Sequence, residues 1–177
     1  MTVADRLDPL DTGRLARMVL LVALGFAVIC IEAMPLGLQA TARPSPDLLL
    51  CLVAFWSLRR PGSAPAVVIF ALALSRDFLT DVPVGAGAMT LLLVSELLKL
   101  RRRALARSNF AMEWITVTLG AILAIALQWF LVVLMLAQPP YLIDLWHQVI
   151  YTMMAYPLMA LLLRYVLCIS WTRTETV

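Results

Sequence analysis

The apolar residues of this chain are gathered into runs that are separated by short polar and charged segments. A bilayer core of about 30 Å needs roughly 20 helical residues to cross, at about 1.5 Å of rise per residue. Three runs reach that length, at residues 18–38, 115–136 and 149–169. Three shorter segments, at residues 47–58, 65–84 and 85–98, can cross only if their polar flanks lie inside the protein or the bilayer thins locally. The pattern predicts an all-α integral membrane protein with six transmembrane helices.

The composition agrees with lipid as the main solvent. Of the 177 residues, 63% are hydrophobic and 14% are charged, whereas a soluble domain averages about half and about a quarter. These proportions exclude an ordinary water-soluble domain and a disordered chain. The formal net charge of +3 does not indicate nucleic acid as a partner, because the arginines flank the apolar runs, where membrane topology explains them.

The basic residues are distributed unequally between the two predicted sides of the membrane. With a cytoplasmic N-terminus, only Arg43 and Arg76 lie outside. The other twelve lie inside, and they are Arg6, Arg14, Arg17, Arg59, Arg60, Lys99, Arg101, Arg102, Arg103, Arg107, Arg164 and Arg173. Such a cytoplasmic excess is the positive-inside signal. We therefore expect a cytoplasmic leader at residues 1–17, a six-helix transmembrane domain at 18–169 and a cytoplasmic tail at 170–177.

Most of the tryptophans lie near the ends of predicted spans. They are Trp56, Trp114, Trp146 and Trp171. Because an amphipathic ring prefers the level of the lipid headgroups, we expect these side chains at the membrane interface.

Charged side chains inside the predicted spans are the first candidates for function, because a charge in hydrocarbon costs at least about 2.5 kcal/mol. They are Glu32, Asp47, Arg76, Asp77, Asp81 and Glu96. Glu32 lies about 21 Å from the inner end of the first span, and Arg76 lies about 18 Å from the inner end of the third. At this similar depth an unpaired charge is costly, so the sequence predicts a Glu32–Arg76 ion pair. Reversing either charge should lower the yield, and reversing both should restore it.

Two further charged groups each admit two interpretations. Asp77 and Asp81 share a helix face, which suits a proton relay or a metal site, while Asp81 just before Pro83 also fits a hydrated span end. Five basic residues after the fourth span either bind anionic lipid headgroups or only fix the topology. They are Lys99, Arg101, Arg102, Arg103 and Arg107.

The sequence carries no catalytic or metal-binding motif. The single histidine, His147, follows Trp146 at the outer start of the sixth predicted span, without a cluster of cysteines or carboxylates at ligand spacing. No nucleophile elbow, phosphate-binding loop or zinc-binding helix motif is present. The three cysteines lie inside apolar runs, where a thiol acts as a small hydrophobe. We therefore expect no enzymatic activity and no cofactor; an intramembrane enzyme that uses a lone carboxylate is one alternative.

Three segments resemble the bacterial rod-shape-determining protein MreD family in their order and spacing. The first, residues 43–61, begins with Arg-Pro, continues as an apolar span that ends in an aromatic residue, and closes in a proline-containing turn. The second, residues 77–85, has an aspartate followed after a short segment by a Pro-Val-Gly step. The third, residues 145–164, is an apolar span with an internal proline and a basic end.

The resemblance implies a bundle of six helices similar to the substrate-binding subunits of energy-coupling-factor vitamin transporters. It also implies a non-enzymatic scaffold of the cell-elongation complex in the bacterial inner membrane, which controls lateral peptidoglycan synthesis and cell shape. The implied partners are MreC and, through it, PBP2, RodA and MreB. The residues that it marks, as partner contacts or as structural turns, are Arg43, Pro44, Asp47, Asp77, Pro83 and Gly85. The alternative is a small-molecule-binding membrane subunit of a transporter, in which the charges within the spans line a polar cavity.

Overall fold

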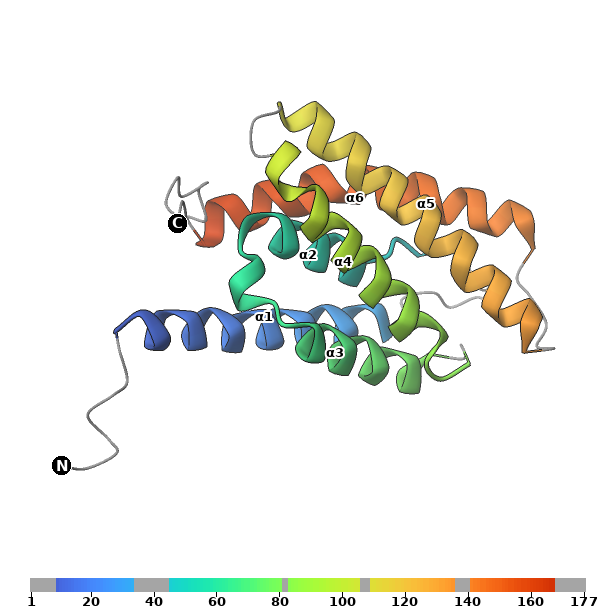
Figure 1. Ribbon diagram of the computed structural model, residues 1–177. Helices are drawn as coiled ribbons and strands as arrows, with labels where there is room; N and C mark the ends of the chain where they lie inside the picture. Colours follow the sequence, from blue (N-terminus) through green and yellow to red (C-terminus); the bar gives the residue numbers. More distant parts are fainter. Residues whose placement is uncertain (1–8, 34–44, 81–82, 106–108, 136–140, 168–177) are drawn as a thin grey trace.

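A computed structural model of the chain describes residues 9–33, 45–80, 83–105, 109–135 and 141–167 (Figure 1). These residues form six α-helices and one short 3-10 turn, so the predicted all-helical fold is confirmed for the described part of the chain. The elements are α1 (Pro9–Ala33), α2 (Leu48–Arg59), η2 (Pro61–Ser63), α3 (Ala66–Leu79), α4 (Ala86–Leu105), α5 (Phe110–Leu134) and α6 (Leu142–Leu167).

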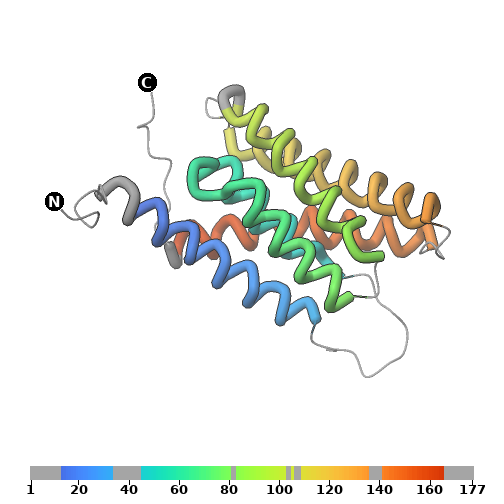
Figure 2. The backbone as a smooth tube through the Cα atoms, turned by 60° about the horizontal axis from the view of Figure 1, so that its bottom comes forward, coloured from blue at the N-terminus to red at the C-terminus, as the bar shows by residue number. Residues whose placement is uncertain are grey.

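Consecutive helices alternate in direction, and the first turn of α1 and the last turn of α6 lie at the same end of the molecule (Figures 1 and 2). The helices follow the predicted order, with different bounds. α1 begins at Pro9 rather than at residue 18, and α6 begins at Leu142 rather than at residue 149. The predicted tail at 170–177 lies outside the described residues.

α2 is the central helix of the bundle, and it contacts α1, α4, α5, α6 and η2. It has only 12 residues, yet every residue from Leu49 to Leu58 is buried. Its apolar sequence therefore reflects contact on all sides, as expected for a helix that is hydrophobic all round. Because the neighbouring helices surround it, the length of α2 does not have to match the thickness of a bilayer.

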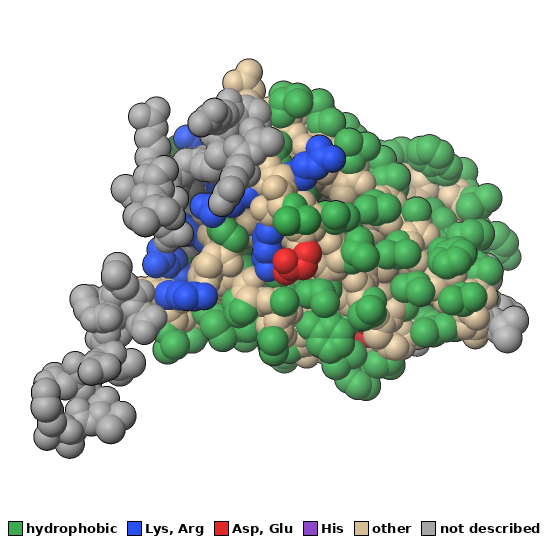
Figure 3. All heavy atoms as spheres, viewed as in Figure 1, with side chains coloured by type: hydrophobic (Ala, Val, Ile, Leu, Met, Phe, Trp, Pro, Cys, Tyr) green, Lys and Arg blue, Asp and Glu red, His purple; other side chains and the backbone are tan. Residues whose placement is uncertain are grey.

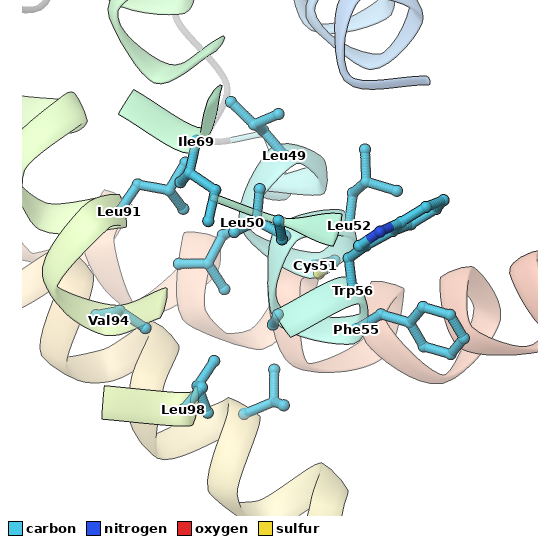
Figure 4. Packing of buried hydrophobic residues seen from close by; sticks show 14 of the residues in the cluster. Leu49, Leu50, Cys51, Leu52, Phe55, Trp56, Ile69, Leu91, Val94 and Leu98 are labelled. Carbon is cyan, nitrogen blue, oxygen red and sulfur yellow. The ribbon is translucent and has the colours of Figure 1, made fainter. Parts of the chain in front are cut away.

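The side chains of α2 interlock with those of α3 and α4 in the buried core (Figure 4). Leu49 and Leu50 lie near Ile69 of α3 and Leu91 of α4, while Val94 and Leu98 of α4 continue the same contact (Figure 4). Close packing of this kind holds helices together through many small dispersion contacts.

The outer surface of the bundle is largely apolar, and the lysines and arginines visible in Figure 3 gather at one end. Large hydrophobic side chains are exposed on every long helix, among them Phe26 of α1, Leu119 of α5 and Leu158 of α6. Soluble monomers rarely expose large contiguous apolar patches. Two described helical segments, Gly13–Ala33 and Phe110–Leu134, are long and apolar enough to cross a membrane. The surface and these two segments are compatible with a membrane protein.

Trp56 does not lie at the surface, so its predicted interfacial position is wrong. The side chain is 1% exposed, and its indole N–H donates to the Ser63 hydroxyl at 3.2 Å. This hydrogen bond connects the end of α2 to the η2 turn. By contrast, Trp146 near the start of α6 is 66% exposed.

Candidate functional site

The N-terminus of α2 is buried in the bundle, and side chains satisfy all four of its unbonded N–H groups. Glu32 Oε1, from α1, accepts from the backbone N–H groups of Leu48 and Leu49 at 2.7 and 3.1 Å. Asp47 caps the helix in the usual local way, because its Oδ1 accepts from the N–H of Leu50 at 2.8 Å. The N–H of Asp47 donates to the Thr152 hydroxyl of α6 at 3.0 Å. The four donors that this helix end would otherwise leave unpaired are thus satisfied by α1, by α6 and by the N-cap residue of α2 itself.

Arg76 of α3 brings a positive charge to these two carboxylates. Its Nη1 lies 2.9 Å from Asp47 Oδ1, and its Nε lies 3.5 Å from Glu32 Oε2. The side chains of Arg76, Glu32 and Asp47 are 17%, 8% and 7% exposed. We refer to these three residues as the capping triad. One guanidinium faces two carboxylates, and the partial positive charge at the N-terminus of α2 compensates about half of the remaining negative charge.

Glu32 and Arg76 form the ion pair that the sequence predicts. Each of the two side chains also has a second role in the structure. Glu32 is also a helix cap, and Arg76 also serves Asp47. The rescue expected from reversing both charges therefore does not follow from this geometry. An arginine at position 32 has no acceptor for the N–H groups of Leu48 and Leu49.

Asp77 performs the same kind of capping at the start of α4. It is 3% exposed, and its Oδ2 accepts from the N–H groups of Gly85 and Ala88 at 2.9 and 3.0 Å. Gly85 has a φ of +95°, in the left-handed region that favours glycine. Pro83 contributes its carbonyl oxygen, which accepts from Ala86 N–H at 3.1 Å. The sequence motif from Asp77 to Gly85 thus forms the turn between α3 and α4.

Gly87 provides the space for the Asp77 carboxylate, because a Cβ atom at this position would collide with Asp77 Oδ1. Gly87→Ala is therefore expected to lower the free energy of unfolding by about 1–3 kcal/mol, as overpacking does. Gly62→Ala is the matched control, since a Cβ atom there meets nothing within 4 Å. In an Asp77→Ala background Gly87→Ala should become neutral or stabilising, because alanine favours the helix. Denaturant titration of the purified variants measures these differences, and an equal cost in both backgrounds would contradict the assignment.

A second buried polar cluster lies at the opposite end of α2. Glu113 of α5 accepts from Arg59 Nη2 at 3.1 Å through Oε2 and from the Tyr156 hydroxyl at 2.7 Å through Oε1. The Arg59 and Glu113 side chains are 7% and 6% exposed, and the Arg59 guanidinium lies 4.8 Å from the centre of the Phe55 ring. We refer to Arg59, Glu113 and Tyr156 as the Glu113 cluster. The position of Glu113 before the apolar run concealed this cluster in the sequence, although a lone acidic residue beside Trp114 was a usable signal.

Trp114 compensates for the proline inside α6. Pro157 has no N–H, so the carbonyl oxygen of Met153 loses its normal partner four residues along the helix. The indole N–H of Trp114 donates to that oxygen at 2.9 Å. This contact links α5 and α6 where α6 lacks a backbone hydrogen bond.

A double-mutant cycle tests this role of Trp114. Trp114→Phe should cost about 1 kcal/mol beyond its lost contacts, because it leaves a partly buried carbonyl oxygen without its hydrogen bond. In a Pro157→Ala background the helix supplies its own N–H, so the same substitution should cost less. Thermal unfolding in detergent measures the coupling energy between the two positions, and purely additive effects would argue against this contact.

Four of the five basic residues expected after the fourth span lie within α4 instead, because this helix continues to Leu105. Lys99 is directed toward the α2–α3 connection, because its Nζ donates to the Ala64 carbonyl oxygen at 2.8 Å and also to Glu96 at 2.8 Å. Arg101 is exposed, and Arg102 is half-buried. Arg107 and the side chain of Arg103 lie outside the described residues, as do Arg43, Pro44 and Asp81.

The charged groups of the site bind each other and the backbone. Within the described residues no group of three or more His, Cys, Asp and Glu side chains is arranged to hold a metal ion. The two carboxylates of the capping triad and that of Asp77 already accept helix N–H groups. Chemically, these carboxylates compensate the partial positive charge at the N-termini of α2 and α4 inside the bundle.

No family model, curated protein or solved structure matches the chain. Fold and site together define an all-helical bundle whose buried charges cap its inner helices. Two of its described helical segments are apolar enough to cross a membrane.

Proposed function

We propose that the protein is a non-enzymatic membrane scaffold of the MreD type, which acts in the bacterial cell-elongation complex. In this proposal six helices cross the inner membrane and both termini are cytoplasmic. The alternation of helix direction supports the six crossings, since α1 begins and α6 ends on the same side (Figure 1). The short α2 is compatible with them because its neighbours cover it on all sides.

The sidedness of the proposal rests on the basic residues. Arg14 of α1, Arg59 at the end of α2 and Lys99 of α4 lie at one end of the bundle, because Arg14 and Lys99 contact the turn that follows Arg59. The capping triad lies at the other end of α2. The positive-inside rule then assigns the basic end to the cytoplasm.

The observation that carries the scaffold proposal is that the buried charges are engaged with one another while the outer surface is apolar. A protein built in this way acts through its helix faces and short loops. Specific recognition in lipid then comes from packing and a few polar contacts. The identity of the partners, MreC and through it PBP2, RodA and MreB, comes from the resemblance of the three sequence segments to the MreD family.

The environment of the residues marked by the resemblance favours structural turns over direct partner contacts. Asp47 and Asp77 are 6% and 3% exposed, and both cap helices. Arg43 and Pro44 precede α2 and lie outside the described residues. We choose Arg43 for a test of partner capture, because substitution of Asp47 or Asp77 would remove a helix cap.

Depletion of the protein in its own host tests the proposed function. Rod-shaped cells should become round, because lateral wall synthesis would lose its scaffold. Affinity purification of the membrane fraction should recover MreC with the wild-type chain, and recover less of it with Arg43→Ala at equal membrane abundance. Arg164→Ala serves as the matched arginine control. Normal cell width with a new nutrient requirement, or a small molecule retained through purification, would instead favour the transporter subunit.

A further inference from the structure

Basic side chains from two distant parts of the chain meet over the η2 turn. Arg14 Nε of α1 donates to the Gly62 carbonyl oxygen at 2.6 Å. Lys99 Nζ of α4 donates to the Ala64 carbonyl oxygen at 2.8 Å. The two bonds place the first turns of α1 and the last turns of α4 around the same turn at the basic end of the bundle.

Two more arginines extend this group. Arg17 follows Arg14 by three residues and Arg102 follows Lys99 by three, so each lies on the same helix face as its predecessor. We name Arg14, Arg17, Lys99 and Arg102 the η2 basic patch. Within the described residues only Lys99 has a carboxylate partner among the four, namely Glu96, whose side chain is 50% exposed. The patch therefore carries positive charge that the described part of the chain does not balance.

Exposed leucines adjoin the patch. Leu15, next to Arg14, is 66% exposed, and Leu100, next to Lys99, is 79% exposed. Figure 3 shows lysine and arginine side chains at this end of the molecule beside hydrophobic ones. An inorganic anion or an acidic soluble protein would satisfy the charges and leave the leucines in water. A phospholipid supplies both a negative headgroup and acyl chains.

We propose that the η2 basic patch binds the headgroups of anionic phospholipids, with Leu15 and Leu100 against the acyl chains. The patch differs from the basic cluster expected from the sequence, because α1 contributes two arginines and Lys99 is held against the turn. Each arginine at the headgroup level strengthens anionic lipid binding by about fivefold. The proposal rests on the membrane location in the proposed function and is independent of the proposed protein partners.

The test uses the full chain reconstituted in phosphatidylcholine vesicles that contain spin-labelled phosphatidylglycerol or spin-labelled phosphatidylcholine. Electron paramagnetic resonance gives the association constant of each labelled lipid from its motionally restricted fraction. The wild-type chain should prefer phosphatidylglycerol, and Arg14→Gln combined with Arg102→Gln should reduce that preference by up to about fivefold per arginine. Raised ionic strength should weaken the preference, since salt screens exposed charges.

Arg164→Gln is the matched control, because Arg164 is an exposed arginine near the end of α6 that does not belong to the patch. It should leave the preference nearly unchanged. At equal ionic strength, inorganic phosphate should displace no more labelled lipid than chloride does. Equal preference in the wild type and in the double variant, or stronger displacement by phosphate than by chloride at equal ionic strength, would overturn the lipid proposal alone. Failure of the chain to enter the vesicles would overturn the membrane location, and the lipid proposal with it.

Discussion

Arg76→Met is expected to lower the free energy of unfolding by about 3–5 kcal/mol, the cost of breaking a buried ion pair by removing one partner. Methionine preserves much of the side-chain volume, so loss of the charge dominates. Without the guanidinium, Glu32 and Asp47 face each other as two carboxylates that are 8% and 7% exposed. The N-terminus of α2 compensates only about half of one charge. Titration of purified protein from mixed micelles into denaturing detergent, followed by tryptophan fluorescence, measures the change.

Glu32→Gln distinguishes the charge of the capping triad from its hydrogen bonds. Glutamine keeps an oxygen that accepts from the N–H groups of Leu48 and Leu49, and it leaves Asp47 paired with Arg76. We expect a loss of about 1 kcal/mol, the difference between a charged and a neutral acceptor. In the Arg76→Met background the same change should recover stability, because it removes one of two uncompensated carboxylates. If Arg76→Met costs no more than Glu32→Gln, the guanidinium of Arg76 does not balance the two carboxylates of the triad.

The helices themselves could be predicted from the chain because their apolar runs are longer than any core strand or loop requires. The burial of α2 could not be predicted from the sequence. A run of 12 apolar residues has the same sequence pattern whether the helix faces lipid or is covered by five neighbouring elements. Trp56 is an example. Its place near a predicted span end implied a position at the membrane interface, whereas its side chain lies inside the bundle.

The contacts of the candidate site could be predicted from the sequence only where the predicted depth of a charge in the membrane restricted its possible partners. Glu32 and Arg76 are opposite charges at similar predicted depth, so the cost of an unpaired charge predicted their pairing. The use of Glu32 as a cap for α2 depends on how the chain returns between the first two helices, which no periodicity encodes. Asp77 is a similar case, since its role depends on Gly87 leaving space for the carboxylate.

Glu113→Leu is expected to be the most costly change at the basic end of the bundle, again by about 3–5 kcal/mol. The substitution removes the carboxylate that Arg59 and Tyr156 share, and both of these side chains come from other helices. Leucine has a similar size, so the loss arises from the guanidinium and the hydroxyl group rather than from a cavity. Tyr156→Phe removes only the hydroxyl contact and should cost about 1–2 kcal/mol.

Combining Glu113→Leu with Arg59→Met separates the ion pair from the packing around it. Apolar groups of matched size in place of a buried pair are often neutral, so the double variant should be more stable than Glu113→Leu alone. The coupling energy from the four unfolding measurements should be well above the roughly 0.5 kcal/mol expected for independent sites. Because the capping triad lies at the other end of α2, Arg76→Met and Glu113→Leu should show no such coupling. Strong coupling between those two distant positions would mean that α2 transmits strain along its length, and the two clusters would then have to be treated as one unit.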